Sequence, residues 1–518
     1  MNSNGPQKDI RSISQAELKI IDDKLQVYEA DVSALEAALK GLHGKRYDLY
    51  EERNRALPIS KLPLEILTQI FFLTCQSSQN PGQQKLPGPF LIGRICRSWR
   101  RIAWFTPKFW TEISLSLSAT RYHTQVELVR EWIERTAECR LHLDIDRYLG
   151  EGEGSVEWEP PEEIFDILLE SCKRWESLRF VAFGNFFKAV DRKPHAQFAS
   201  LKKLIVRRHP MQRPESWACR PWFLMLNNQI EQLAFERGIS RRNLVINWSC
   251  LQNLRASLTL HDWFEVLKQC ETLKGCDLMV RGVTSVGMPA IPPIKIVLPH
   301  LTSFKLCGFD QTFPFLLQSL ELPNLTMLQF SIWRTTRADA CWVTALIEIA
   351  RRCCFPLQDL TIVQTDKQSG CPKVPEEDIC NLLDVIPTLE HLRLELPEPF
   401  SLSDTTLLQL AVKAEILDGR MLTLGNFLDL KNVEYKGQIS FTLDKLLDML
   451  TSRAALVHIS SIRGEASSSA AKDKGKFHMQ INYTNQDWYR QKNPNDLPQF
   501  YNHLVSMSAL VRLDLCYM

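Results

Sequence analysis

Residues 150–154 read Gly-Glu-Gly-Glu-Gly, a glycine spacing that a phosphate-binding loop could use. In such a loop backbone N–H groups surround the phosphate, and a Lys followed by Ser or Thr completes the site. Here Glu151 and Glu153 alternate with the glycines, and no Lys-Ser or Lys-Thr pair follows. Because like charges repel, this segment is a poor candidate for binding a nucleotide.

Cysteine and histidine are the other residues whose chemistry could define a site, and the chain has 15 and 11 of them. The cysteines are scattered from Cys75 to Cys516 without a Cys-x-x-Cys pair. The motifs His-Glu-x-x-His and Gly-x-Ser-x-Gly are also absent from the sequence. We therefore expect reduced thiols that pack as small hydrophobes, with no metal, no cofactor and no catalytic residue.

The overall composition is that of an ordinary globular protein of 518 residues. Lys and Arg number 62 against 60 Asp and Glu, so the net charge of +2 creates no field that would attract nucleic acid or an anionic membrane. The first residues lack the apolar segment of a secretory signal, and no run approaches the ~18 apolar residues that span a bilayer. These features predict a cytoplasmic or nuclear protein whose partners are proteins.

The elements that must position a protein-binding site begin with residues 14–56, which carry a helical pattern. Apolar residues alternate three and four apart, and only Arg46 interrupts the series. The series is Leu18, Ile21, Leu25, Tyr28, Val32, Leu35, Leu39, Leu42 and Leu49. A seam of this period over about four heptads predicts a coiled coil, either as a hairpin or by self-association through residues 18–49. The alternative is an amphipathic helix that lies on the protein's own body.

A second block, residues 57–112, is short and very apolar. Pro63 is well placed to begin a helix in which Ile66 and Ile70 share one face with it, while Leu67 and Phe71 share another. A second helix is expected from about residue 90 to residue 103, followed by a short turn that ends at residue 110. A block of this size is marginal for an independent core, so the rest of the chain or a partner must cover its second face.

This block resembles an F-box. The matching residues are Leu62, Pro63, Glu65, Ile66, Leu67, Ile70, Phe71, Ile95, Cys96, Trp99, Pro107 and Trp110. The connection between its helices is longer than is usual in the family. The resemblance covers only residues 62–110, and it implies a three-helix module that binds the Skp-type adaptor of a cullin-based ubiquitin ligase.

The resemblance also implies which side chains contact the adaptor. They are Leu62, Pro63, Glu65, Ile66, Ile70, Leu91, Ile95, Trp99 and Trp110. Trp99 and Trp110 are interpreted as large anchors, with packing inside the module as the alternative, and Trp104 is expected to pack internally. Four nearby arginines are expected to form a solvated rim that favours an acidic partner. They are Arg94, Arg97, Arg100 and Arg101.

The remainder, residues 113–518, repeats a short pattern of apolar, two residues, apolar, one residue, apolar, as in Leu325-Leu328-Phe330. Most copies lie about 21 to 32 residues apart, near the period of leucine-rich repeats. The last two apolar residues of each copy point to one side of a strand, and helical patterns lie between copies. The sequence therefore predicts an α/β solenoid with parallel strands on one side and helices on the other.

These repeats resemble the irregular leucine-rich repeats that often follow an F-box, but the Asn expected after each strand is missing. Phe183, His209, Phe309 and Trp333 stand in its place. Residues 464–476 are small and polar, which predicts a disordered insertion that would explain the long final interval between copies.

The outward strand positions should line the inner surface of the solenoid, and six of them are basic and five acidic. They are Arg179, Arg207, Glu236, Arg255, Asp277, Lys305, Arg393, Glu395, Glu434, Lys436 and Asp514. We take six of them as candidate contacts to a target protein, with an ordinary solvated face as the alternative. They are Arg179, Arg207, Arg255, Lys305, Arg393 and Glu395. A nucleic-acid groove would be mostly basic, so mixed signs favour a protein partner.

The two resemblances together predict a non-catalytic substrate-recognition subunit of an SCF-type E3 ubiquitin ligase. Its F-box would hold the Skp-type adaptor and through it a cullin, and its repeats would hold an unknown target protein. The alternative is a scaffold without any link to a ligase, which oligomerises through its coiled coil and binds partners through its repeats.

Overall fold

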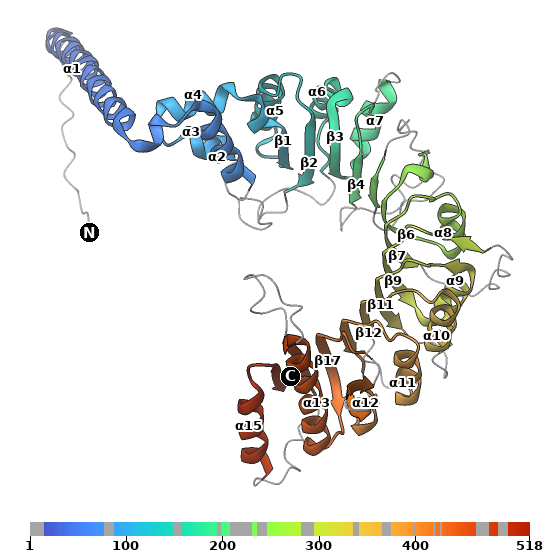
Figure 1. Ribbon diagram of the computed structural model, residues 1–518. Helices are drawn as coiled ribbons and strands as arrows, with labels where there is room; N and C mark the ends of the chain where they lie inside the picture. Colours follow the sequence, from blue (N-terminus) through green and yellow to red (C-terminus); the bar gives the residue numbers. More distant parts are fainter. Residues whose placement is uncertain are drawn as a thin grey trace, which may run out of the picture. The chain divides into compact units, whose positions relative to one another are not determined.

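The computed structural model describes most of the chain, apart from several segments. They are residues 1–14, 77–87, 149–157, 194–197, 208–229, 236–245, 281–294, 335–340, 365–373, 398–399, 418–419, 425–426, 463–475, 485–495 and 518. The chain divides into two compact units (Figure 1). The first comprises Met1–Thr111 with Glu131–Cys139, and the second comprises Glu112–Arg130 with Arg140–Met518.

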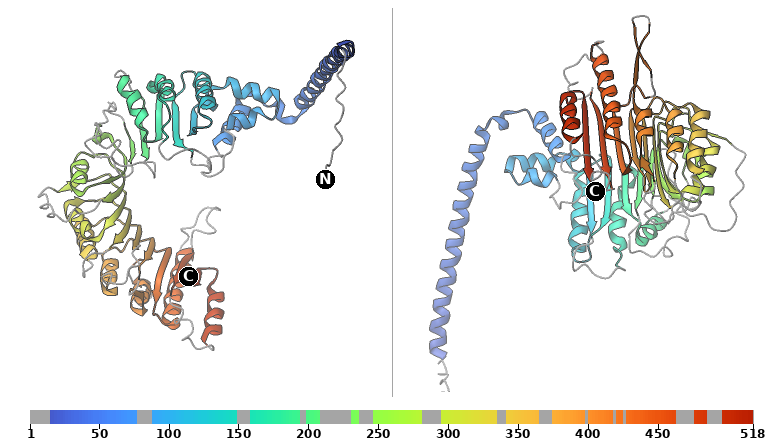
Figure 2. Two further views of the ribbon diagram at one scale, coloured as in Figure 1. Left: turned by 180° about the vertical axis from the view of Figure 1, so that it is seen from behind. Right: turned by 90° about the horizontal axis from the view of Figure 1, so that it is seen from below.

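The first unit is helical in its described residues. Its elements are α1 (Gln15–Ala56), η1 (Pro58–Lys61), α2 (Leu64–Gln76), α3 (Gly88–Gly93), α4 (Arg97–Phe105), η2 (Pro107–Trp110) and the last turns of α5 (Tyr122–Arg135). The long helix predicted for residues 14–56 is confirmed as α1, none of whose residues is buried. Figure 2 shows α1 as one unbroken helix.

The single helix predicted from residue 90 to residue 103 is wrong, because the chain leaves the helix between α3 and α4. Cys96 is extended and caps α4, since its Sγ accepts a hydrogen bond from the Trp99 backbone N–H at 3.4 Å. Gly93 ends α3 where the Trp104 ring crosses it, and a Cβ at this position would lie 2.3 Å from that ring. A side chain at residue 93 would therefore displace Trp104.

The second unit is built on a sheet that contains 15 strands among the described residues. Along the main path the strands are β1 (Glu112–Leu117), β2 (Leu141–Arg147), β3 (Trp175–Val181), β4 (Lys203–Arg207), β5 (Gln232–Phe235), β6 (Asn253–Leu258), β7 (Gly275–Val280), β9 (Ser303–Phe309), β11 (Met327–Arg334), β12 (Asp359–Gln364), β13 (His391–Glu395), β17 (Asn432–Ile439), β18 (Phe477–Tyr483) and β19 (Val511–Tyr517). Strand β14 (Ser401–Leu402) pairs with β17, and every neighbouring pair in this sheet is parallel. Two small ribbons accompany the sheet, one of β8 (Ile296–Val297) with β10 (Leu320–Glu321) and one of β15 (Lys413–Leu417) with β16 (Arg420–Leu424).

Helices connect the strands and lie along one side of this sheet (Figures 1 and 2). Besides the start of α5 they are α6 (Glu162–Glu170), η3 (Cys172–Arg174), α7 (Gly184–Arg192), η6 (Trp248–Cys250), α8 (Leu260–Leu267), η7 (Asp310–Thr312), α9 (Phe313–Ser319), α10 (Cys341–Cys353), α11 (Glu376–Asp384), α12 (Asp404–Leu410), α13 (Leu443–Ile462) and α15 (Asp496–Met507). Successive strand residues alternate between the two faces, so that one set, mainly apolar, is buried under the helices and the other set faces away from them. The α/β fold with a solenoid of parallel strands is therefore confirmed.

Backbone hydrogen bonds hold successive repeats in a constant register. The Gln252 carbonyl accepts bonds from the N–H groups of Lys274 and Gly275 at 2.8 and 3.0 Å. One repeat later, the Lys274 carbonyl accepts bonds from Thr302 and Ser303 at 2.9 and 3.1 Å. The same arrangement, in which one carbonyl accepts two N–H groups of the next repeat, recurs before most strands. The backbone of each repeat is therefore hydrogen-bonded to that of the next one.

Carboxylates make further bonds between repeats, in a solenoid that lacks the regular Asn. Glu376 at the start of α11 accepts a hydrogen bond from the Ser403 backbone N–H at 3.1 Å, at the start of α12. Asp404 of α12 in turn accepts one from the Thr442 backbone N–H at 2.6 Å, just before α13. Each acidic side chain thus satisfies the N-terminus of the next helix, where the helix dipole favours negative charge.

The prediction that a polar insertion accounts for the long final interval is wrong. Helix α13, strand β18 and helix α15 lie between β17 and β19, so the interval contains an additional repeat. The sequence pattern missed β18 because its apolar residues simply alternate, from Phe477 to Tyr483, without the preceding leucine. The predicted disorder itself concerns residues 464–476, which except for Lys476 lie outside the described part of the chain.

Candidate docking surfaces

The first unit exposes a band of apolar side chains on its short helices. Helix α2 buries Leu67 and Phe71, whereas Ile66 and Ile70 on a neighbouring face are 44% and 40% exposed. Because the helix is apolar on both faces, one face forms the core of the unit and the other meets solvent. The described part of the unit therefore leaves open the side that the sequence indicated.

Most of the predicted adaptor contacts lie on exposed surface. Leu91 and Ile95 are 43% and 62% exposed, and Leu62, Pro63 and Glu65 are exposed as well. Further apolar side chains of α2 and α4 that the sequence analysis did not select are exposed, namely Leu64, Phe72, Leu73 and Phe105. Phe105 is 81% exposed, which is extreme for a phenylalanine. A family motif could not identify it, because its position follows from the turn between α4 and η2.

The tryptophans occupy different environments. Trp99 is half-buried, with its ring centroid 4.6 Å from that of Phe71, so it packs on the core of the unit and keeps one edge accessible. Trp110, predicted as an anchor, is 0% exposed, and its Nε1 donates to the Ala103 carbonyl at 2.8 Å. The indole of Trp110 is therefore inaccessible to a partner and serves the packing of the unit instead.

Trp110 is the centre of an aromatic cluster. Phe90, Trp104 and Trp132 each lie edge-on to it, with ring centroids 5.4 Å away. The Trp132 Nε1 donates to the Trp110 carbonyl at 2.7 Å, and the Arg135 guanidinium lies 4.8 Å from its ring. Edge-to-face rings and a cation over an aromatic face are favourable arrangements. As predicted, Trp104 packs internally.

The four arginines near the tryptophans do not form a uniform rim. Arg100 donates from Nε to the Gly93 carbonyl at 2.8 Å, which bridges the break between α3 and α4. Arg97 lies 3.4 Å from the Asp48 carboxylate and 5.3 Å from the Tyr47 ring, both on α1. Arg94 and Arg101 are exposed, so only these two fit the predicted rim without qualification.

The second unit exposes a row of polar side chains on the face of the sheet opposite the helices. Strand register places Arg255 beside Asp277, and Asp277 beside Lys305. In the same way, the register places Arg179 beside Asp144 and Arg393 beside Glu434, which belong to the same row of polar side chains. All six predicted target contacts lie on this face, at exposed or half-buried positions.

Most basic side chains of the row are paired with carboxylates. Arg207 contacts Asp144 at 2.9 Å, Arg255 contacts Asp277 at 3.3 Å and Arg393 contacts Glu434 at 3.3 Å. Burial raises the pKa of Asp144, against the opposing effect of the arginines, because part of its water is removed. Glu395, the acidic candidate, bonds to Lys436. These pairs neutralise one another and leave little net charge.

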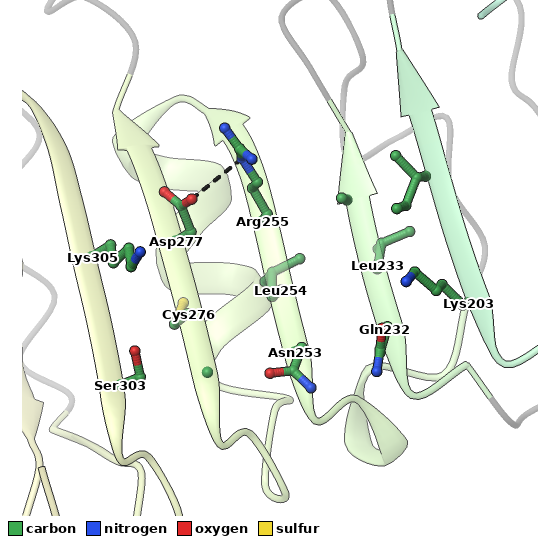
Figure 3. A pocket seen from close by; sticks show the side chains of 13 residues that line it. Lys203, Gln232, Leu233, Asn253, Leu254, Arg255, Cys276, Asp277, Ser303 and Lys305 are labelled. Atoms are coloured by element: carbon green, nitrogen blue, oxygen red, sulfur yellow. Dashed lines mark ion pairs between the residues drawn. The ribbon is translucent and has the colours of Figure 1, made fainter. Parts of the chain in front are cut away.

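An open depression lies on this face between β4 and β9, and Figure 3 shows its lining. Gln232, Asn253 and Ser303 supply polar groups, and the Arg255–Asp277 pair crosses its centre. Lys203 and Lys305 stand toward its two sides (Figure 3) and form no ion pair with any described residue. Sequence reasoning selected Lys305 but missed Lys203, which precedes the apolar positions of its strand.

No group of three or more His, Cys, Asp or Glu residues in the described segments could hold a metal ion. Burial raises the pKa of the Cys270 thiol to about 12, which opposes formation of a reactive thiolate. None of the described helices is long and apolar enough to cross a membrane.

Comparison of the sequence with models of protein families and with curated proteins gives no match to either. The order of helices and strands supports a repeat solenoid. Two surfaces bear on function: the exposed apolar side chains of the first unit and the polar face of the sheet in the second.

Proposed function

We propose that the chain is a non-catalytic substrate receptor of an SCF-type ubiquitin ligase, in which the first unit docks a Skp-type adaptor. The observation that carries this proposal is the exposed apolar band around Ile66, Ile70, Leu91 and Ile95. Clustered apolar side chains that meet water are a signature of protein interaction sites. Their positions coincide with those that the F-box resemblance assigns to the adaptor, and the adaptor would bring the cullin.

The best test of adaptor docking replaces apolar residues of the band without disturbing the core. Leu91→Asp should weaken binding of a purified Skp-type adaptor at least ~30-fold, measured by titration calorimetry on the full chain, because a carboxylate would be buried in an apolar interface. Leu408→Asp on α12 is the matched control, since Leu408 is 55% exposed and belongs to the second unit. Equal adaptor affinity of the two variants, or no binding by the wild type, would contradict the proposal and favour the scaffold alternative.

For the target, we propose that the depression between β4 and β9 binds an acidic segment of a protein. Lys203 and Lys305, which form no ion pair with any described residue, lie four strand spacings apart in the sheet order. At ~4.8 Å per spacing this is about 19 Å, the length of about six extended residues. The polar groups between the lysines would contact the backbone of such a segment.

A labelled oligoglutamate peptide tests this assignment through fluorescence anisotropy. Replacing Lys203 and Lys305 by Glu should lower its affinity at least ~10-fold, and rising salt should weaken its binding to the wild type. The matched control replaces Lys188 and Lys445 on helices α7 and α13, which changes the net charge equally. A similar loss in both variants would mean that the peptide responds only to net charge, and the acidic-segment assignment would be abandoned.

A further inference from the structure

Helix α1 presents a continuous apolar seam that the protein's own described residues do not cover. The nine apolar residues of the seam, from Leu18 to Leu49, are each between 45% and 70% exposed. In heptad notation, the residues at position a are Leu18, Leu25, Val32, Leu39 and Arg46. The d positions are Ile21, Tyr28, Leu35, Leu42 and Leu49. Exposed a and d residues over this length are a strong liability unless another helix covers them.

The contacts of α1 with the rest of its unit use other faces of the helix. Arg97 of α4 approaches Tyr47, Asp48 and Glu51, which are b, c and f positions. The a and d positions around them, Arg46 and Leu49, remain exposed. The described body of the first unit therefore meets α1 from the side and leaves the seam open, which argues against the helix lying on its own chain.

The charges along α1 indicate what covers the seam. Residues 20–30 carry three acidic side chains and one basic, whereas residues 37–47 carry three basic and none that is acidic. If a second copy of α1 ran antiparallel, with Leu18 opposite the partner's Leu49, these two stretches would face each other. Opposite charges beside an apolar seam specify partner and orientation in coiled coils.

A parallel pair would be much less favourable. It would stack Arg46 against its own copy within the core. The flanking g and e positions would place Glu17 near Asp22 and Asp31 near Glu36 of the other chain, against one favourable pair, Lys24 with Glu29. In the antiparallel pair Arg46 shares a layer with Ile21 and can reach the adjacent Asp22 carboxylate. Glu17 would then face Lys45, and like charges would meet only at the centre of the seam, where Asp31 and Glu36 each lie opposite their own copy.

We propose that the chain forms a homodimer in which two α1 helices pair as an antiparallel coiled coil through residues 18–49. The proposal is independent of adaptor binding, because none of the seam residues belongs to the F-box-like band. Such a dimer would carry two adaptor-docking units and two repeat sheets, so a target with two copies of a recognition segment would be held with avidity.

The seam is tested by two substitutions of the same kind on the same helix. Val32 occupies an a position and Val27 a c position, and they are 54% and 59% exposed. In sedimentation analysis of the full chain, the wild type should have twice the mass of one 59.8 kDa chain. Val32→Lys should raise the dimer dissociation constant at least ~100-fold, and Val27→Lys should change it less than ~3-fold. A monomeric wild type, or equal effects of the two variants, would overturn the proposal.

The orientation is tested by exchanging one charge pair. In the antiparallel dimer Glu17→Lys should weaken association ~3- to 10-fold, because it faces Lys45, and Lys45→Glu in the same chain should restore it. In a parallel dimer Glu17→Lys would instead strengthen association, since residue 17 would face Asp22. Circular dichroism of each variant checks that α1 remains helical. A strengthened Glu17→Lys dimer, or no rescue by the double exchange, would refute the antiparallel arrangement.

Discussion

The two units differ in how far their apolar side chains are exposed to solvent. In the second unit the apolar strand residues are sealed between sheet and helices, as Leu254, Leu278 and Phe304 show with at most 2% exposure. In the first unit Ile95, Phe105 and the whole seam of α1 meet solvent. Sealed apolar surface stabilises a fold, whereas exposed apolar surface is retained at a cost in solubility and indicates contact with other chains. This difference in exposure is why the proposed adaptor docking is placed on the first unit, whereas the second unit presents a polar face of its sheet.

The largest expected effect on one unit alone comes from replacing Trp110, the centre of the aromatic cluster in the first unit. Trp110→Ala should lower the free energy of unfolding of the first unit by about 3–5 kcal/mol, because it leaves a large cavity and removes the donor to the Ala103 carbonyl. Hydrogen exchange should then increase in α2, α3 and α4 and remain unchanged in β6 to β12. Phe105→Ala is the control and should change stability by less than about 0.5 kcal/mol. Equal effects would mean that the cluster is not the core of the unit.

Among the described residues of the second unit, Arg453 is the one cation in the buried interior, and it offers a second test of the difference between the units. Its guanidinium is 1% exposed and donates to the carbonyls of Leu410 and Phe427, at 2.8 and 2.6 Å. Burial lowers its pKa to about 10, so it is still charged at neutral pH. Arg453→Met should destabilise the unit by about 2–4 kcal/mol in denaturant titration, because both carbonyls lose their donor. Unchanged stability would show that water can replace the guanidinium.

The carboxylates that connect repeats should have a smaller effect. Glu376→Ala removes the acceptor for the Ser403 backbone N–H and for the hydroxyls of Ser403 and Thr406. We expect a loss of about 1–2 kcal/mol, detected as faster hydrogen exchange at the start of α12. Glu377→Ala is the neighbouring control, since Glu377 is exposed. Equal exchange in the two variants would exclude the inter-repeat cap.

The smallest expected effect is a pH dependence of the last strands. The hydrogen bond from His478 and the nearby Arg512 lower the pKa of Asp514 below its usual value. A carboxyl whose folded pKa is lowered stabilises the fold above its unfolded pKa of about 4, and this contribution is lost as pH falls through the folded pKa. Hydrogen exchange in β19 should therefore differ between wild type and Asp514→Asn at pH 6, and the difference should shrink below pH ~4. A constant difference would contradict the assignment.

The sequence predicted the repeat architecture well because each strand carries its own signal, such as Leu325-Leu328-Phe330 in β11. It missed the break between α3 and α4, which depends on the approach of Trp104 to Gly93, and the alternating strands β1, β2 and β18. It placed the apolar band of the first unit but misjudged Trp110, because composition does not reveal which of two apolar faces turns inward. The bonds of Glu376 and Arg453 join residues more than 25 positions apart, so no local pattern reports them.

The most direct test of the central claim, that the apolar band of the first unit is a docking face, is hydrogen exchange of the full chain with and without a purified Skp-type adaptor. We predict protection of backbone amides in residues 62–73 and 91–105, with no change in strands β3 to β19. Protection confined to the strands, or none anywhere under saturating adaptor, would contradict the account.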